Sequence, residues 1–177
     1  MALILVIVAA LVGTACTNSP ATPTSPSLPP AASTTTRLFF TSDPASFVGQ
    51  GQSRTYTLQN ATFHPLIGHA GRYLSIVIRP TDPADTSLSW SMVMMAPFGQ
   101  QLSPATYSAG EVDAFAPFFS FGGGGRACGS GTTATFTIHE IATSGETLQR
   151  LRMSFTMYCG GSATVRGEVV ILADPWR

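Results

Sequence analysis

Side chains able to perform acid–base or nucleophilic chemistry are few in this chain and scattered along it. The 177 residues include nine acids, three histidines and three cysteines, and charged residues make up 10% of the total. Catalysis of this kind needs a nucleophile or general base within hydrogen-bonding reach of a partner group. No recognisable constellation brings such residues together, so the sequence favours a binding or structural protein over an enzyme.

The histidines are the first residues to consider as metal ligands. His64 and His69 flank a turn-like segment, but the spacing indicates no third ligand. His139 precedes Glu140 at the end of an expected strand. Neighbouring strand residues point to opposite faces, so we expect no acid–base pair there. The histidine pattern therefore predicts neither a metal site nor a catalytic dyad.

Two further segments resemble ion-binding loops without meeting their requirements. Asp82 and Asp85 lie in a turn, but calcium loops usually supply more carboxylates. Residues 122–125 are all glycine and precede Arg126. A phosphate-binding loop needs a strand before it and a helix after it, whereas a β pattern follows here. We therefore predict a plain turn and a flexible loop, with no metal or cofactor.

The N-terminal segment predicts export. Residues 3–12 are apolar, which is too short for the roughly 20 residues of a membrane-spanning helix and fits a signal-peptide core of about 7–15 residues. Together with Gly13-Thr14-Ala15-Cys16, the segment resembles a bacterial lipoprotein signal. This resemblance implies a signal peptide over residues 1–15 and lipidation of Cys16, which would anchor the protein to the cell envelope. The alternative is an ordinary secretory signal cleaved near Ala15, giving a secreted protein.

Cysteine counting points to the same compartment. With Cys16 assigned to lipid, Cys128 and Cys159 remain as an even pair, and such pairs usually form disulfides in an oxidising compartment. The competing interpretation is a thiol nucleophile or half of a metal site. The sequence has no CxxC motif or nearby histidine pair to support it, so we predict a Cys128–Cys159 disulfide.

Arg126 is the residue most suited to a specific polar contact. It lies two residues before Cys128, where a disulfide would fix its position. A guanidinium can hold a carboxylate through two parallel hydrogen bonds. We expect a structural ion pair with Glu140 or Glu168, and the alternative is a contact to a bound ligand.

The rest of the chain divides into a linker and one domain. Residues 16–36 are rich in Pro, Thr and Ser, a composition that favours an extended, semi-rigid linker. Residues 37–177 show apolar–polar alternation typical of strands. The clearest strands are predicted at Thr133–Ile141, Leu151–Cys159 and Ala163–Ile171, and they should form an antiparallel meander.

Further strands are predicted earlier in the domain, at Leu38–Thr41, Arg54–Leu58, Ala61–His64, Tyr73–Arg79, Leu88–Met94 and Phe118–Phe121. Short strands with turns between them predict an all-β fold, an antiparallel β-sandwich or flattened barrel of about 8–10 strands. Trp90 lies on the apolar side of its strand and is expected in the core.

Several short motifs in the domain resemble a known kind of domain. They are Thr41-Ser42-Asp43-Pro44 with Phe47-Val48-Gly49-Gln50-Gly51, Ala96–Leu102 with Pro104 and Tyr107, Gly125-Arg126-Ala127-Cys128, Phe155, Cys159-Gly160-Gly161, and Arg166-Gly167. Residues 40–172 thereby resemble an uncharacterised all-β domain of bacterial secreted proteins and lipoproteins, from which Ala105 and Gly160 depart. The resemblance implies the fold and the cysteine pair, and it implies no activity.

These observations predict an envelope-anchored lipoprotein that is a non-enzymatic ligand- or partner-binding or structural module. Its expected partners are the membrane, through the lipid, and a protein or glycan. The net charge is zero and no basic patch is visible, which argues against nucleic acid. The alternatives are an envelope hydrolase and a protease-inhibitor-like domain, for which Phe98–Pro104 would be the inhibitory loop.

Overall fold

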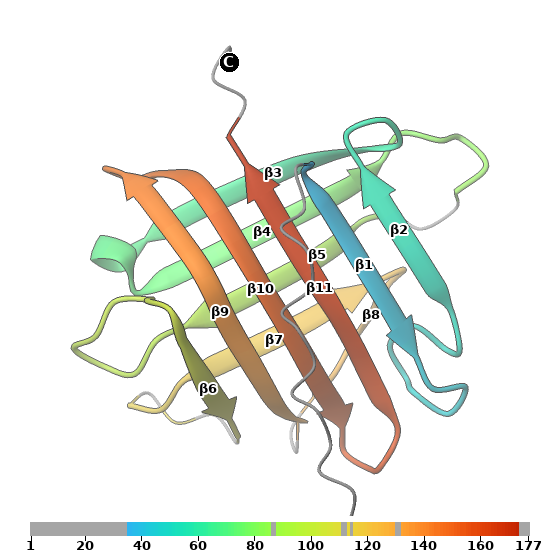
Figure 1. The fold of residues 1–177 in the computed structure, drawn as a ribbon. Helices are drawn as coiled ribbons and strands as arrows, with labels where there is room; N and C mark the ends of the chain where they lie inside the picture. Colours follow the sequence, from blue (N-terminus) through green and yellow to red (C-terminus); the bar gives the residue numbers. More distant parts are fainter. Residues whose placement is uncertain (1–34, 86–87, 111–112, 114, 130–131, 174–177) are drawn as a thin grey trace, which may run out of the picture. The chain divides into compact units, whose positions relative to one another are not determined.

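Eleven strands and one short 3₁₀ turn make up the regular structure of the part of the chain that the computed structural model describes, residues 35–85, 88–110, 113, 115–129 and 132–173 (Figure 1). The strands are β1 (Arg37–Ser42), β2 (Ser53–Thr57), β3 (Ala61–Gly68), β4 (Tyr73–Pro80), β5 (Trp90–Met95), β6 (Ala105–Ala109), β7 (Phe118–Gly123), β8 (Arg126–Ala127), β9 (Thr132–Ser144), β10 (Thr147–Cys159) and β11 (Thr164–Leu172), and η1 spans His69–Gly71. The predicted signal peptide and Cys16 lie outside the described residues.

The strands form two antiparallel sheets, which confirms the predicted β-sandwich. Sheet A has the order β2-β1-β11-β10-β9-β6, and sheet B has the order β3-β4-β5-β7-β8. Figure 1 shows sheet A in front of sheet B, with the strands of the two sheets crossing in this view. The count exceeds the predicted 8–10 because the sequence patterns of β6 and the two-residue β8 were too short to detect.

The predicted meander of β9, β10 and β11 is present, and its alternation explains why the sheet buries one face. Leu151, Met153, Phe155 and Met157 of β10 are buried, whereas the residues between them face outward. Their cross-strand partners on β9 and β11 are also apolar or small, as Phe136 and Gly167 are opposite Phe155. Period-two patterning therefore directs one side of sheet A onto sheet B.

A continuous series of aromatic rings fills the core between the sheets. Phe40, Phe155, Phe136 and Tyr107 come from sheet A, and Trp90, Phe121 and Phe119 come from sheet B. Successive ring centroids along Phe40, Trp90, Phe121, Phe155, Phe119, Phe136 and Tyr107 are 4.4–5.4 Å apart. Such ring pairs contribute about 0.5–1.5 kcal/mol each beyond their buried area. Trp90 is 3% exposed, which confirms its predicted place in the core.

The Cys128–Cys159 disulfide is formed, as predicted. Cys128 directly follows β8 of sheet B, and Cys159 ends β10 of sheet A. Their Cα atoms are 5.2 Å apart, and both cysteines pack against the core. The disulfide therefore ties the β7–β8 hairpin to the opposite sheet.

Removal of this disulfide should destabilise the domain. In the full chain, we expect Cys128→Ser with Cys159→Ser to lower the free energy of unfolding by about 3–4 kcal/mol, because the unfolded chain gains entropy. Guanidinium denaturation followed by circular dichroism measures this change, and Ser162→Ala, in the exposed β10–β11 turn, is the control that keeps the pair. Free thiols at both positions in unreduced protein, or an unchanged midpoint, would contradict the assignment.

Candidate functional site

Arg126 is presented by a tight hairpin rather than by a flexible loop. β7 ends at Gly123 and β8 begins at Arg126, so only Gly124 and Gly125 form the turn. Both have positive φ, 60° and 77°, and a two-residue hairpin turn of type I′ requires positive φ at both of its central residues. The prediction of a flexible glycine loop was therefore wrong, because the first two glycines of the run are strand residues and the last two close the hairpin.

The ion pair predicted for Arg126 does not form, and that prediction was wrong. Glu140 instead binds Arg150 at 3.0 Å, and Glu168 binds Arg37 and Arg152 across sheet A. The reason is the strand order, because Glu140 and Glu168 lie on the outer face of sheet A beside arginines of neighbouring strands. Arg126 makes no hydrogen bond or ion pair with any of the described residues.

Arg126 instead lines a recess of about 130 Å³ between the two sheets, which we call the arginine recess. Its other lining residues are Gly49, Gln50, Gln52, Arg54, Trp90, Gly123 and Gly124. They come from the β1–β2 loop, from β2, from the start of β5 and from the β7–β8 hairpin. Two arginines and no acid line the recess, so it is electropositive.

Arg54 is held in the recess by a polar chain that begins in the core. The buried Trp90 Nε1–H donates to the Tyr56 hydroxyl at 2.9 Å, and that hydroxyl donates to Asp85 Oδ2 at 2.8 Å. Arg54 Nη1 donates to the same oxygen at 3.1 Å, and its Nε donates to Gln52 Oε1 at 3.0 Å. These bonds fix the guanidinium, which is one third exposed, before any ligand arrives.

Sequence reasoning missed Arg54, although a signal was present. Arg54 and Tyr56 alternate along β2, and Tyr56 is buried. A charged residue on the core-facing side of a strand is unusual and needs a partner. That position indicates a buried polar contact, but its partner, Asp85, lies in a distant turn that no local pattern connects to β2.

Two glycines allow the recess to form. A Cβ at Gly123 would overlap the Trp90 ring, so only glycine lets β7 pass directly beside the indole. Gly49 has a φ of +88°, and a Cβ there would lie 2.6 Å from Ser42 Oγ. The β1–β2 loop can therefore fold back onto β1 and cover the side of the recess.

Asp43 fastens the same β1–β2 loop to β11. Its Oδ2 accepts hydrogen bonds from the Thr164 N–H at 2.8 Å and the Thr164 hydroxyl at 2.9 Å, and Arg166 lies 3.5 Å from its other oxygen. The pKa of Asp43 is lowered below its ordinary value of 3.8. The largest cause is the hydrogen bond from the Thr164 backbone, followed by the bond from its hydroxyl group and more weakly by the Arg166 charge, while desolvation opposes them. The ionised carboxylate is thus the form that holds the loop.

We expect Asp43→Ala to destabilise the full chain at neutral pH. A depressed pKa in the folded state means that this stabilisation is fully present above about pH 3.8 and is lost as the pH falls through the folded pKa. Urea midpoints of both proteins should therefore converge in acid. Glu146→Ala, in the exposed β9–β10 turn, is the control, and a constant difference between Asp43→Ala and the unaltered chain at all pH values would refute the linkage.

A second recess, of about 250 Å³, shares Arg54 with the first. It is lined mainly by polar residues of β2, of the β2–β3 turn and of the turn that contains Asp82 and Asp85. Asp82 Oδ1 accepts the Ala84 N–H at 2.9 Å, and Asp85 is bound by Arg54 and Tyr56. These contacts show the predicted turn with both carboxylates engaged in hydrogen bonds. We call this hollow the polar recess.

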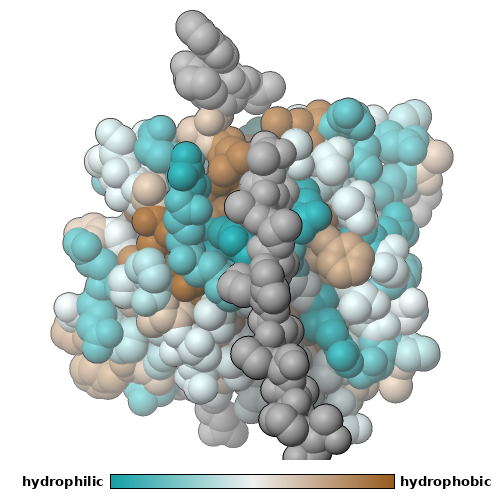
Figure 2. Space-filling model, viewed as in Figure 1, coloured by the Kyte–Doolittle hydropathy of each residue, from teal (hydrophilic) through white to brown (hydrophobic). Residues whose placement is uncertain are grey.

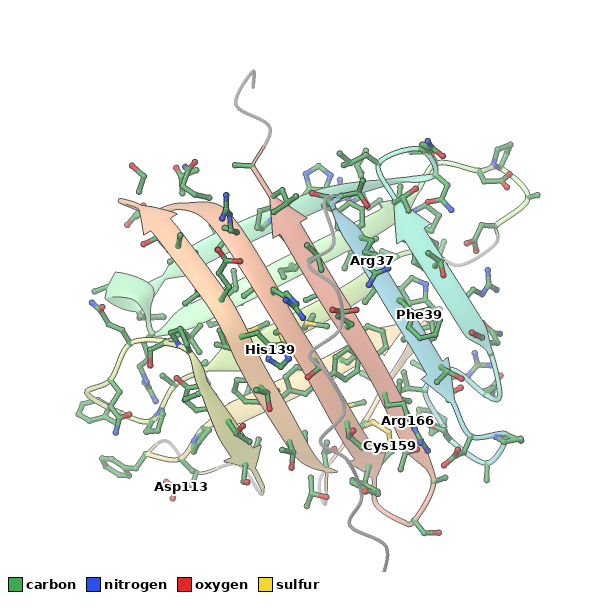
Figure 3. The ribbon with its side chains drawn as sticks, in the orientation of Figure 1. Arg37, Phe39, Asp113, His139, Cys159 and Arg166 are labelled. Atoms are coloured by element: carbon green, nitrogen blue, oxygen red, sulfur yellow. A yellow bond between two sulfur atoms is a disulfide. The ribbon has the colours of Figure 1, made fainter. Side chains whose placement is uncertain are left out.

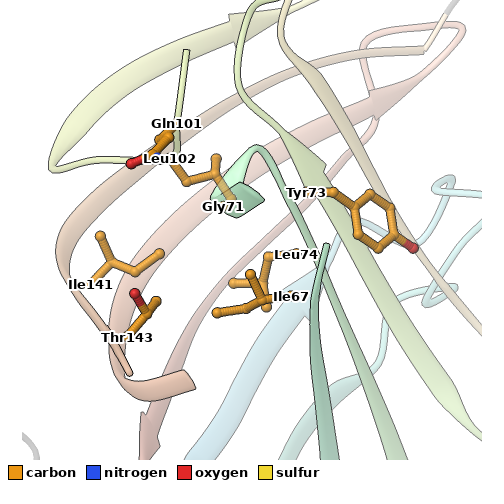
Figure 4. Close-up of a pocket in the computed structure, with 8 residues that line it drawn as sticks. All are labelled: Ile67, Gly71, Tyr73, Leu74, Gln101, Leu102, Ile141 and Thr143. Atoms are coloured by element: carbon orange, nitrogen blue, oxygen red, sulfur yellow. The ribbon is translucent and has the colours of Figure 1, made fainter. Parts of the chain in front are cut away.

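A third hollow, of about 100 Å³, lies near η1 (Figure 4). Ile67 and Leu74 of sheet B, together with Ile141 of β9, give it apolar walls, and Gln101 and Thr143 add uncharged polar groups. No charged side chain lines it. This hollow therefore offers less for specific recognition than the arginine recess does.

A β-bulge changes the predicted geometry at His139. Glu140 is opposite Arg152 and Ile138 is opposite Met153, which leaves His139 as an extra residue on β9. His139 and Glu140 consequently share the outer face of sheet A, where Nε2 of His139 lies 3.0 Å from the Ser154 hydroxyl (Figure 3). The prediction of opposite faces was wrong because the bulge interrupts the period of two. Glu140 pairs with Arg150.

The other two histidines also have local contacts. Nε2 of His64 lies 3.0 Å from the Thr62 hydroxyl, and the His69 ring meets Tyr73 edge to face. Across the residues that the structure describes, no group of three or more His, Cys, Asp and Glu side chains is arranged to hold a metal ion.

The outer face of sheet A is charged but internally paired. Glu168 lies between Arg37 and Arg152, and Phe39 is partly exposed beside them (Figure 3). Figure 2, viewed from this side, shows hydrophilic and hydrophobic residues interspersed over the visible surface. Because Glu168 already pairs with both arginines, an approaching acidic ligand would have to displace it.

The loop from Phe98 to Pro104 is exposed at one end and fixed at the other. Phe98 is 65% exposed and stacks edge to face on the exposed Phe115. Leu102 is buried, its N–H donates to Gly71 O at 3.0 Å, and the Tyr107 hydroxyl bonds to both backbone groups of Ser103. A fixed, exposed loop is what the protease-inhibitor alternative requires, and that alternative stays a prediction.

Comparisons of the chain with protein-family models, with curated proteins and with solved structures found no match. Within the described ranges, none of the helices is long and apolar enough to cross a membrane.

Proposed function

We propose that this chain is an exported, lipid-anchored protein of the bacterial cell envelope whose β-sandwich binds a ligand without transforming it. The N-terminal sequence supports the anchor, through the apolar residues 3–12 and the small residues before Cys16. The Cys128–Cys159 disulfide is compatible with an oxidising compartment. A protein or a glycan of the envelope is the expected partner.

The observation that carries the binding proposal is the state of Arg126. Its guanidinium lines a recess, the described residues give it no partner, and its strand is held by the disulfide two residues away. A guanidinium that has no protein partner and is carried on a fixed backbone is able to meet an acceptor group on a ligand. The ligand-contact interpretation of Arg126 therefore has better support than the structural pair.

The chemistry of the recess supports binding rather than catalysis. Its lining residues supply guanidinium and amide groups, an indole and glycine backbone, and no thiol, imidazole or carboxylate is among them. Acid–base or nucleophilic catalysis requires a group that exchanges a proton or attacks the substrate. An arginine stays protonated and does neither. A hydrolase remains the alternative.

The anchor is tested by Cys16→Ser in the full chain. We expect the unaltered protein to fractionate with membranes and to be sensitive to globomycin, which blocks lipoprotein signal cleavage, because acyl chains hold it in the bilayer. Cys16→Ser should leave processing blocked or release the protein from membranes. Unchanged processing and fractionation would contradict lipid attachment.

The binding site is tested by a ligand screen that does not assume a ligand class. We expect ligand-observed NMR with a library of small metabolites to give compounds whose binding to the full chain is lost in Arg126→Gln. Arg79→Gln is the matched control, because Arg79 is exposed on β4 and does not line the recess. A library without any Arg126-dependent compound would count against the recess as a ligand site.

A further inference from the structure

We infer that the arginine recess binds the carboxylate of a hydroxylated organic acid, such as a uronic acid. This inference rests on the proposed function, namely that the recess is a ligand site. It adds the chemical class of the ligand and the direction in which the ligand lies.

The charge of the site selects an anion. Arg54 and Arg126 both line the recess, and Asp85 is the acid that binds Arg54 behind it. Asp85 is 11% exposed, whereas Arg54 is one third exposed. These three groups leave one positive charge in excess. A carboxylate carries the single negative charge that would compensate it.

The hydrogen-bonding groups select an acceptor. Arg54 uses Nη1 for Asp85 and Nε for Gln52, which leaves part of its donor fork unused. The Arg126 guanidinium makes no hydrogen bond with any of the described residues, so all of its N–H donors can bind a ligand. Because Gln52 Oε1 already accepts from Arg54, its amide NH₂ is left as a further donor. These unused donors fit an ionised carboxylate, which only accepts hydrogen bonds.

The size and the walls of the recess favour an organic acid over an inorganic oxyanion. A volume of about 130 Å³ is well below the roughly 300–1,000 Å³ of a pocket that encloses a whole small molecule. The recess therefore accommodates one end of a ligand. The Trp90 ring and the backbone of Gly123 and Gly124 form a partly apolar wall, which suits the carbon skeleton behind a carboxylate.

The polar recess gives the direction of the rest of the ligand. Arg54 lines both this hollow and the arginine recess, and the larger volume of the polar recess is lined mainly by polar residues, among them Thr55, Asn60 and Asp82. Carboxylate and amide oxygens accept hydrogen bonds from hydroxyl groups. A ligand whose acid group contacts Arg126 and Arg54 would thus place its hydroxyl groups against β2 and the Asp82 turn.

The experiment is an NMR titration of the isotopically labelled full chain in detergent with D-glucuronate. We expect shifts of the Arg126 and Arg54 side-chain resonances and of the Trp90 indole N–H. D-Glucuronamide, the neutral analogue of the same shape, should bind at least about tenfold more weakly, because it lacks the charge that strengthens arginine hydrogen bonds. Arg126→Gln should weaken glucuronate binding by a similar factor, and Arg79→Gln should leave it unchanged.

The outcomes separate this inference from the proposed function. Equal binding of glucuronate and glucuronamide, binding of inorganic phosphate without any organic acid, or indifference to Arg126→Gln would overturn the carboxylate assignment. In those cases an Arg126-dependent compound of another class from the unbiased screen would still uphold the ligand site. Tighter binding of a uronic-acid tetramer than of the monomer would support an envelope polymer as the source, and equal binding would support a free acid.

Discussion

The constraint on which the structure depends is the series of aromatic rings between its two sheets. From Phe40 to Tyr107 each ring contacts the next, and the series passes repeatedly from one sheet to the other. Apolar burial alone would fix the separation of the sheets but would leave their relative position loosely defined. Ring contacts have preferred geometries, so the series also fixes how strands of sheet A lie over those of sheet B.

Rings near both ends of this series carry polar groups that are hydrogen-bonded, and one of these rings leads to the candidate site. At the Tyr107 end, the hydroxyl holds the backbone of Ser103. Next to Phe40, at the other end, the Trp90 indole N–H connects through Tyr56 and Asp85 to Arg54. A buried polar group without a partner is costly, so the Trp90 indole N–H requires this series of hydrogen bonds. The requirements of the core thereby position one of the two arginines of the recess, and the disulfide holds the other.

The fold could largely be predicted from the sequence, whereas the site could not. Alternation along β10 and β11 is a local signal and gave the meander correctly, and the cysteine count gave the disulfide. The recess combines the β1–β2 loop with the β7–β8 hairpin, segments more than seventy residues apart whose proximity depends on sheet order. The same reason explains why Arg126 does not pair with Glu140 or Glu168, since sheet order places other arginines on neighbouring strands beside both carboxylates. The local sequence likewise gives no indication of the β-bulge at His139.

The distribution of ion pairs explains why ligand recognition is expected between the edges of the two sheets rather than on a sheet face. Arg37, Arg150, Arg152 and Arg166 cover the outer side of sheet A, and each has an acidic partner within reach. A ligand acid approaching that face would have to displace an existing carboxylate and would gain little. Arg79 has no acidic partner among the described residues, but it lies exposed on β4, where water competes for its donors. Arg126 combines a missing partner with a partly enclosed position, and this combination makes a new charge pair favourable.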